Sequence, residues 1–459
     1  PISQATPQVE RGSIVDRSGL PLAVQTNFFH VGLSIKNLKD NANLKQRFAN
    51  DMASVLDMTP DQILTIINSN RSFAYLKKKI TPTEYETVKS LTDKKNYNFV
   101  SYEKIPGRNY PNHALASQLV GYMGDDGKGL AGIEFSQQSV LQPEFDPNAE
   151  EQPQGRNIYL TIDANLQYKL EQICHRVMNE TQAEGMMLIA ADSTSGEILS
   201  YISLPSADLN EYGSSPTAAR VDLPSMTMYE PGSVFKIFTT GIVYDEHGIS
   251  PNEKFYCDGV YERRLSNGET VKIRCLEQHG WCTAKEGLMY SCNDVLGQIS
   301  DRIGEDEFIA RIRQLVFGQK TGIELPGETP GSVKDTSSPT WSARSKPTSA
   351  IAQESSVSGL QMVQAATAIA NGGLPVKLTF IHKITNKDGT DYYQHEPESM
   401  NRVFAKNTAE YILSCMETVA REGTGHRANL RDIAIGVKTG TAQMADKEKG
   451  GYSDTDFLS

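Results

Sequence analysis

Ser233 and Lys236 stand three residues apart in the stretch Glu-Pro-Gly-Ser-Val-Phe-Lys, residues 230–236. The Pro-Gly pair predicts a turn, and the apolar residues that follow predict a buried helix that begins near Ser233. Free backbone N–H groups at a helix N-terminus favour a developing negative charge. Lys236 shares a helix face with the serine, and burial among apolar neighbours favours its neutral form, which can accept the serine proton. The pattern predicts Ser233 as a nucleophile.

Because Ser-x-x-Lys also occurs by chance in a chain of this length, the interpretation depends on partners elsewhere in the sequence. The first partner is Ser291-Cys292-Asn293, which begins 58 residues after Ser233. It lies between two segments with helical patterns, so its side chains can point into a cleft. A hydroxyl there can transfer a proton, and an amide can hold a substrate carbonyl.

The second partner is the sequence Lys-Thr-Gly-Thr near the end of the chain. The apolar residues of 433–437 alternate as in a strand, and such an edge can accept an extended peptide. The lysine provides positive charge for a substrate carboxylate and also favours the neutral form of Lys236. The glycine removes a side chain where a substrate backbone must lie close, and the threonines provide hydroxyls. These residues are Lys438, Thr439, Gly440 and Thr441.

Composition limits the possible functions. The 459 residues carry a net charge of −11 and contain no basic cluster that could follow a phosphate backbone, so nucleic acid is not expected as a partner. No run of about 18 apolar residues is present, so no segment is expected to span a bilayer. The chain opens at Pro1 rather than at a methionine, and we therefore expect that an N-terminal membrane anchor precedes it.

The sequence predicts two domains. Residues 143–156 are rich in Pro, Glu, Gln and Asn and have the composition of a linker. We therefore expect an N-terminal domain over residues 1–155 and a second domain over residues 156–459. In the first, residues 11–19 predict a hairpin, residues 43–91 predict small helices, and Arg108 and Glu134 are expected to tie strands together.

The second domain has an α+β pattern. A predicted strand at 158–162 is followed by a helix with Leu166, Leu170, Ile173 and Val177 on one face. Two strands, 186–191 and 198–202, then form a hairpin. This order predicts helices packed on a mostly antiparallel sheet.

Four further residues could bind a metal ion. Cys257, Cys275, His279 and Cys282 offer three sulfur ligands and one nitrogen ligand, the number and type that a tetrahedral structural zinc site requires. A Cys257–Cys275 disulfide, with His279 and Cys282 packed beside it, is an alternative interpretation, as are free thiols.

The three triplets, in this order, resemble those of penicillin-binding proteins and class A β-lactamases. Further stretches resemble the class B penicillin-binding proteins, in which an N-terminal pedestal lies beneath a transpeptidase domain. Gly359 departs from this pattern, because a proline is usual there. The resemblance covers the chain from residue 11 to about residue 442. The further stretches are residues 11–17, 108–111, 129–134, 353–357, 360–362 and 423–425.

The resemblance implies a peptidoglycan D,D-transpeptidase that is also a target of β-lactam antibiotics. Ser233 would attack the penultimate D-alanine carbonyl of a stem peptide, with Lys236 as the base. Ser291 would pass a proton to the leaving amine, and Asn293 would hold an amide of the acyl side chain.

The resemblance also assigns the substrate-binding end of the site. Lys438, Thr439 and Thr441 would bind the substrate carboxylate, and the backbone N–H groups of Ser233 and Thr441 would form the oxyanion hole. An amine of a neighbouring stem peptide would then resolve the acyl-enzyme.

The family context implies partners and rivals. No deacylating Glu-x-x-Leu-Asn pattern lies between Ser291 and Lys438, so a bound penicillin is expected to remain attached. The N-terminal region does not resemble a glycosyltransferase, so a separate polymerase is expected as a partner. The catalytic domain is expected outside a cell membrane, in division, sporulation or cell-shape maintenance, and the C-terminus is expected to be incomplete. The alternatives are a D,D-carboxypeptidase and a β-lactam sensor or non-catalytic cell-wall scaffold. No cofactor is expected for catalysis.

Overall fold

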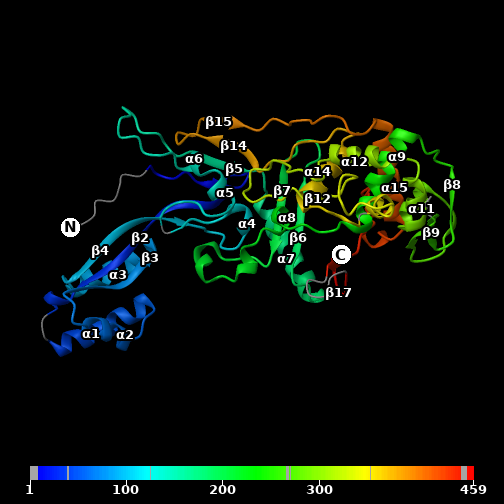
Figure 1. Cartoon of the computed structure of the whole chain (residues 1–459). Coiled ribbons are helices and arrows are strands. Elements are labelled where there is room, and N and C mark those ends of the chain that lie inside the picture. The colour runs from blue at the N-terminus through cyan, green and yellow to red at the C-terminus, as the bar shows by residue number, and fades with distance from the viewer. Residues whose placement is uncertain are drawn as a thin grey trace.

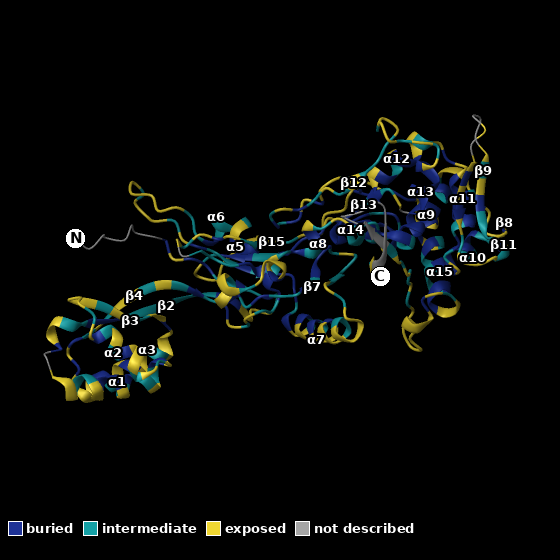
Figure 2. Cartoon of the chain, turned by 60° about the horizontal axis from the view of Figure 1, so that its bottom comes forward, coloured by how far each residue is buried: buried dark blue, intermediate teal, exposed yellow. Residues whose placement is uncertain are grey.

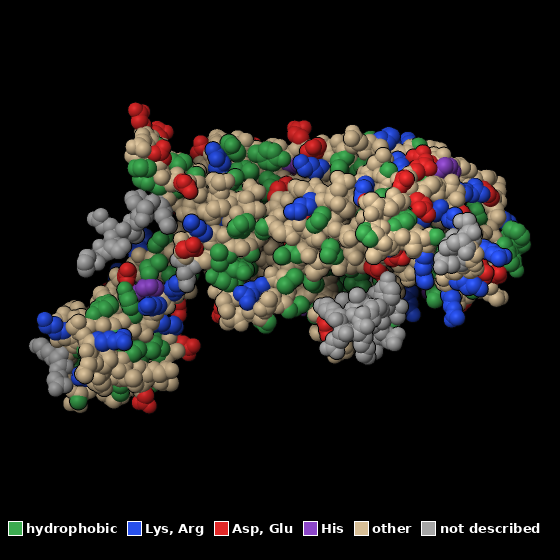
Figure 3. Space-filling view, in the orientation of Figure 1, with side chains coloured by type: hydrophobic (Ala, Val, Ile, Leu, Met, Phe, Trp, Pro, Cys, Tyr) green, Lys and Arg blue, Asp and Glu red, His purple; other side chains and the backbone are tan. Residues whose placement is uncertain are grey.

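A computed structural model of the chain shows an elongated molecule, with a small N-terminal lobe at one end and a larger body at the other (Figure 1). Basic and acidic side chains are interspersed over the face shown in Figure 3. Among the helices of the described residues, none combines the length and hydropathy that crossing a bilayer requires. The structure describes residues 9–38, 41–124, 126–264, 268, 270–351, 353–445 and 452–458.

The N-terminal lobe is an antiparallel sheet with helices packed against it. Strand β2 pairs with both β3 and β4, and a cluster that includes Val31, Leu33 and Phe48 fills the space between sheet and helices. The small helices predicted over residues 43–91 are present, and α2 begins after Thr59, which forms a capping box with Gln62. The elements are β2 (Pro21–Ser34), α1 (Ala42–Leu56), α2 (Pro60–Ile67), β3 (Phe73–Ile80), α3 (Pro82–Lys95) and β4 (Val100–Asn109).

One sheet connects the lobe to the body. Its strand order is β15-β14-β5-β1-β2-β3, with β4 also paired to β2. The predicted hairpin of residues 11–19 is confirmed, because β1 pairs antiparallel with β2. Residues 143–156 contain no helix or strand, and the boundary at residue 155 stays a prediction. The further strands are β1 (Ile14–Val15), β5 (Asn157–Leu160), β14 (Ile381–Thr385) and β15 (Asp391–Gln394).

A buried carboxylate links the first strands to the short helices that follow. Glu134 accepts a hydrogen bond from Arg11 Nε at 2.7 Å and from Arg108 Nε at 2.6 Å, and all three side chains are almost fully buried. The expected structural role of Arg108 and Glu134 is thus confirmed, and removing any member would leave a buried charge without its partner. The short helices are α4 (Ser117–Val120), α5 (Gly132–Ser136) and α6 (Gln138–Leu141).

Helix α7 (Ala164–Thr181) packs on the hairpin of β6 (Met186–Ala191) and β7 (Ile198–Leu204), as predicted. Its buried face differs from the predicted one, because Gln167 and Glu171 are buried whereas Ile173 is 45% exposed. Gln167 donates to the Tyr201 carbonyl at 2.7 Å, and Glu171 accepts from the backbone of Ala116 at 2.9 Å. These specific hydrogen bonds outweigh the hydrophobic pattern in orienting the helix.

The body has a helical core. The buried segments concentrate around α9, α11, α13 and α14 (Figure 2), where one cluster of apolar side chains includes Phe235, Phe238 and Phe317. The helices are α8 (Leu223–Met226), α9 (Lys236–His247), α10 (Ala284–Met289), α11 (Asn293–Ser300), α12 (Glu305–Gln314), α13 (Ser345–Ala350), α14 (Gly359–Ala370) and α15 (Lys406–Glu422).

Short antiparallel strand pairs complete the body. β8 pairs with β11, and β9 pairs with β10, in the segment between Lys236 and Ser291. β12 pairs with β13, and β16 with β17. The strands are β8 (Lys254–Cys257), β9 (Val260–Arg264), β10 (Thr270–Arg274), β11 (Gly280–Thr283), β12 (Ser332–Val333), β13 (Ser355–Ser356), β16 (Ala442–Ala445) and β17 (Tyr452–Leu458).

Candidate active site

Ser233 lies on a helical turn, as the sequence predicts. Residues Gly232–Phe235 form a 3₁₀ turn that continues directly into α9 at Lys236. Gly232 has φ +57°, a left-handed conformation that favours glycine. The Ser233 side chain is half-buried. Its hydroxyl therefore lies at the start of a helix and remains accessible to a small substrate.

The amine of Lys236 is removed from solvent. The residue is fully buried on α9, and its Nζ donates to the Ser291 carbonyl at 2.6 Å, to Asn293 Oδ1 at 2.7 Å and to Ser291 Oγ at 3.3 Å. Burial, together with the charge of Lys438, lowers the pKa of Lys236 to about 7. In the described part of the chain no hydrogen bond joins this amine to Ser233, three residues earlier.

Ser291 and Asn293 lie at the junction of α10 and α11, as predicted. Ser291 has φ +56°, which is unusual for a residue other than glycine. Asn293 begins α11 and donates from Nδ2 to the carbonyl of Arg274 at 2.8 Å, which fixes the orientation of its amide. The junction thus turns the hydroxyl and the amide oxygen towards Lys236.

Lys438 approaches Ser291 from a different part of the chain. Its Nζ donates to Ser291 Oγ at 3.1 Å and to the Thr439 carbonyl at 2.7 Å. Burial lowers the pKa of Lys438 to about 8. The Ser291 hydroxyl therefore lies between two amines, those of Lys236 and Lys438, and can exchange protons with either.

Gly440 permits the Lys-Thr-Gly segment to contact the serine turn. A Cβ atom on Gly440 would lie 2.7 Å from Val234 Cγ2 and 3.1 Å from the Pro231 carbonyl oxygen. A Cβ atom on Gly232 would lie 3.0 Å from the Thr441 carbonyl oxygen. The two backbones are therefore in direct contact, which places Thr441 beside the Ser233 turn.

The predicted strand at residues 433–437 is wrong. The structure assigns no strand to these described residues, and the backbone N–H of Val437 donates instead to the Met416 carbonyl on α15 at 3.1 Å. Apolar alternation predicts a strand only where another strand can pair with it. Here a helix lies alongside, so the pattern has no sheet to join.

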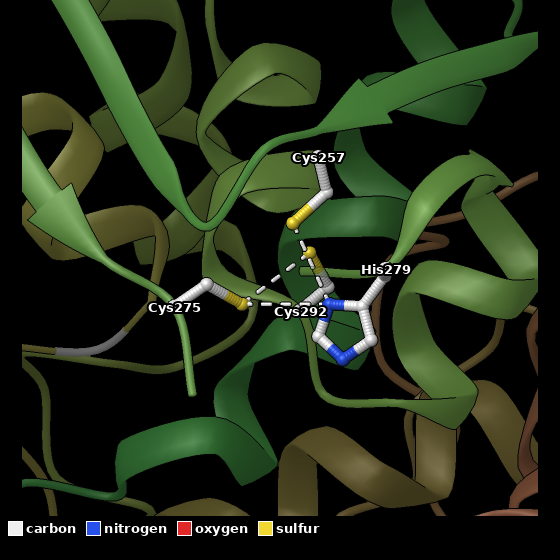
Figure 4. A group of neighbouring side chains, drawn as sticks. All are labelled: Cys257, Cys275, His279 and Cys292. Atoms are coloured by element: carbon white, nitrogen blue, oxygen red, sulfur yellow. Dashed lines mark hydrogen bonds between the residues drawn. The ribbon is translucent and has the colours of Figure 1, made fainter. Parts of the chain in front are cut away.

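The cysteine cluster is near the Ser-x-Asn triplet, with one change from the predicted set. The ligand atoms of Cys257, Cys275, His279 and Cys292 lie within 4.8 Å of one another and converge from different segments (Figure 4). Cys282 is outside this group, which corrects the prediction. Cys282 on β11 pairs with Phe255 on β8, two positions along the strands from the pair formed by Gly280 and Cys257. The Cys282 Sγ is directed to the His279 carbonyl at 3.5 Å.

None of the six cysteines is in a disulfide. The Sγ atoms of Cys275 and Cys292 are 3.6 Å apart, and each of Cys257 and Cys275 lies within 3.6 Å of His279 Nδ1. The hydrogen bond from Cys292 lowers the pKa of Cys275, which favours the thiolate form of Cys275.

Sequence reasoning missed two residues of the site. Cys292 was visible as the central residue of the Ser-x-Asn triplet, but only the fold brings it to Cys275. Thr424 Oγ1 lies 2.7 Å from Thr439 Oγ1 and can orient that hydroxyl. The sequence feature that marks Thr424 is the pair of glycines beside it, Gly423 and Gly425. A Cβ atom on Gly423 would collide with Met289, and one on Gly425 would collide with Val437.

Comparisons with known proteins agree with this arrangement. Residues 186–459 match the family model described as penicillin binding protein transpeptidase domain, and residues 6–144 match the model described as penicillin-binding protein dimerisation domain. Stage V sporulation protein D of Bacillus subtilis is 28% identical, over 96% of this chain and 70% of its own length.

Two further similar proteins extend the comparison. The probable peptidoglycan D,D-transpeptidase PenA of Neisseria gonorrhoeae is 25% identical, over 98% of this chain and 76% of its own length. The crystal structure of penicillin-binding protein 3 from Mycobacterium tuberculosis in complex with aztreonam superposes with a TM-score of 0.75, at 24% identity, over 98% of this chain and 85% of that one. This structural similarity shows the fold alone.

The two lysines predict a bell-shaped pH dependence for acylation of Ser233. An amine whose pKa is lowered to about 7 is a base only above that pH, so the rate should fall about tenfold per pH unit below it. Lys438 can attract a carboxylate only while its amine is charged, so the rate should also fall above about pH 8. The measurement is the second-order rate constant for acylation by a penicillin.

The matched variant for this profile is Lys438→Arg. A guanidinium stays charged throughout the range, so the alkaline limb should disappear while the acidic limb remains. A rate constant that does not change with pH in the wild-type chain would contradict the assignment of Lys236 as the base.

Proposed function

This chain belongs to the penicillin-binding protein transpeptidase family, and from that premise we propose that it is a serine-type peptidoglycan D,D-transpeptidase that cross-links stem peptides. The observation that carries the proposal is the fully buried Lys236 amine, which donates to both Ser291 and Asn293. The names of the relatives support the same reaction. β-Lactams would acylate the same serine, which agrees with the aztreonam complex of a structural neighbour.

In the proposed acylation, Ser233 Oγ attacks the penultimate D-alanine carbonyl and its proton passes to the neutral amine of Lys236. The developing oxyanion accepts hydrogen bonds from the backbone N–H groups of Ser233 and Thr441, whose backbones lie in contact. The peptide C–N bond then breaks. Ser291 gives its proton to the departing D-alanine nitrogen and is reprotonated by the Lys236 ammonium, which restores the neutral amine.

We propose that the donor peptide binds at the amine of Lys438. The charged Lys438 and the hydroxyl of Thr439 would hold the terminal carboxylate of the stem peptide, and Asn293 would hold an amide of its side chain. In the second half-reaction, an acceptor amine attacks the acyl-enzyme ester and its proton passes to Lys236. The ester C–O bond then breaks, and the Lys236 ammonium returns that proton to the Ser233 oxygen. The product is a peptide cross-link.

We place this reaction outside the cytoplasmic membrane, where peptidoglycan lies. We also propose an N-terminal membrane anchor and a glycosyltransferase polymerase that supplies the glycan strands. The dimerisation domain matched at residues 6–144 offers a surface apart from the catalytic site for such contacts.

The proposed reaction can be tested with a synthetic stem peptide that ends in D-Ala-D-Ala, together with an acceptor peptide that carries a free amine. Mass spectrometry should detect a donor–acceptor conjugate and an equal amount of released D-alanine. Ser233→Ala should abolish both products, whereas Ser214→Ala, which alters an exposed serine, should not. Hydrolysed donor without conjugate would indicate the carboxypeptidase, and no D-alanine release would indicate a sensor or scaffold.

We also propose that Cys257, Cys275, His279 and Cys292 hold a structural zinc ion. A tetrahedral zinc with Zn–S near 2.3 Å and Zn–N near 2.0 Å separates its ligand atoms by roughly 3.5–3.8 Å. Three of the separations, Cys257 to His279, Cys275 to His279 and Cys275 to Cys292, are 3.5–3.6 Å and fit this requirement, and all four ligand atoms lie within 4.8 Å of one another. A zinc ion there would supply a structural cross-link between the β8–β11 strands and the Ser-x-Asn junction.

The zinc proposal predicts about one equivalent of metal per chain purified without chelator, as measured by elemental analysis. Cys257→Ser should lose the metal and lower the melting temperature, because the metal-bound state is the folded state. Cys282→Ser is the matched control and should keep the metal. A metal-free protein with a Cys257–Cys275 disulfide, found by non-reducing peptide mapping, would refute the site.

A further inference from the structure

The segment immediately before Ser233 is docked on a second segment far along the chain. Tyr229 and Val357 exchange both backbone hydrogen bonds, at 3.0 Å and 2.8 Å, as an isolated antiparallel bridge. The backbone N–H of Glu354 donates to Glu230 Oε1 at 2.9 Å. The segment before the serine turn therefore contacts residues 354–357, and these contacts lie just before Gly232 in the sequence.

The side chain of Glu354 is held on the opposite side by three donors. Its Oε2 accepts from Lys334 Nζ at 2.7 Å and from Ser345 Oγ at 3.0 Å, and its Oε1 accepts from Thr348 Oγ1 at 3.0 Å. Burial alone raises the pKa of this carboxyl, but the three hydrogen bonds outweigh burial and lower it overall. The carboxylate is therefore ionised and fixed at neutral pH.

The backbone of Glu354 is in a conformation that its residue type disfavours. Its φ is +65°, in the left-handed region that favours glycine. A residue other than glycine keeps this backbone conformation only when several contacts with its surroundings hold it there. The three donors provide that constraint, because they hold the Glu354 carboxylate while the Glu354 backbone N–H is hydrogen-bonded to Glu230.

We propose that Glu354 is a positioning residue for the nucleophile: its anchored carboxylate fixes its own backbone N–H on Glu230 and so sets the position of the Ser233 turn relative to Lys236. The Lys236 amine is held by other contacts, its burial and its hydrogen bonds to Ser291 and Asn293. A displacement of about 1 Å between reacting groups can reduce a rate about 100-fold. The inference rests on the proposed role of Ser233.

The test compares acylation by a penicillin in Glu354→Gly, Glu230→Ala and the double variant. Glycine suits the left-handed backbone, so Glu354→Gly removes the carboxylate without adding strain. We expect each single variant to lower the limiting acylation rate constant about 10- to 100-fold, with the dissociation constant of the initial complex changed less than about twofold. Because both act through one hydrogen bond, the double variant should be no slower than the slower single variant.

Two further variants separate positioning from general stability. Lys334→Met removes a donor to the Glu354 carboxylate without changing Glu354, and it should slow acylation in the same way. Glu328→Gln is the matched control, because Glu328 is a buried loop carboxylate that accepts hydrogen bonds from Thr321 and Gly322. It should acylate at the wild-type rate even if its melting temperature falls.

The outcomes distinguish the possible failures. A wild-type rate in both Glu354→Gly and Lys334→Met, or losses that multiply in the double variant, would overturn the positioning role. The acylation rate in Glu328→Gln could instead fall as far as in Lys334→Met, with both losses in proportion to the fall in melting temperature. That result would assign the effect to stability. If the wild-type chain itself is not acylated, the proposed function fails, and that result is distinct from the others.

Discussion

The active centre depends on one constraint, the removal of a lysine amine from water. Lys236 has no solvent exposure, and its acceptors are the carbonyl and hydroxyl of Ser291 and the amide of Asn293. Because burial disfavours the charged form, the amine can act as a base near neutral pH. α9 places Lys236 within the helical core, and the α10–α11 junction supplies the acceptors. Lys438 adds a second positive charge that disfavours protonation of Lys236.

The sequence predicted those parts of the site that depend on local structure. The Pro-Gly turn and apolar run around Ser233 are local, as are the helices on both sides of Ser291, and these elements were predicted correctly. The strand at 433–437 and the buried face of α7 were not, because each depends on what lies beside the element. The alternation of apolar residues does not reveal that residues 433–437 lie against helix α15 and not against a strand of the described residues. An apolar stripe likewise does not reveal that Gln167 has buried partners.

The cysteine set illustrates the same limit. Cys282 follows His279 closely in sequence, yet strand pairing places it opposite Phe255 and away from Cys257, and the helix junction brings Cys292 in its place. This substitution changes the meaning of the cluster, because Cys292 lies between Ser291 and Asn293. The cluster is therefore directly connected to the triplet that holds the Lys236 amine. Distant segments thus converge on the site by contacts that no sequence spacing reveals.

The central claim, that Ser233 is the nucleophile of a transpeptidase site, is tested most directly by intact mass spectrometry after incubation with a penicillin, followed by peptide mapping. The account predicts a gain of one drug mass that persists, located on the peptide that contains Ser233, and no gain in Ser233→Ala. An adduct retained in Ser233→Ala, or mapped to another residue, would contradict the claim. So would a wild-type chain that is folded but takes up no drug.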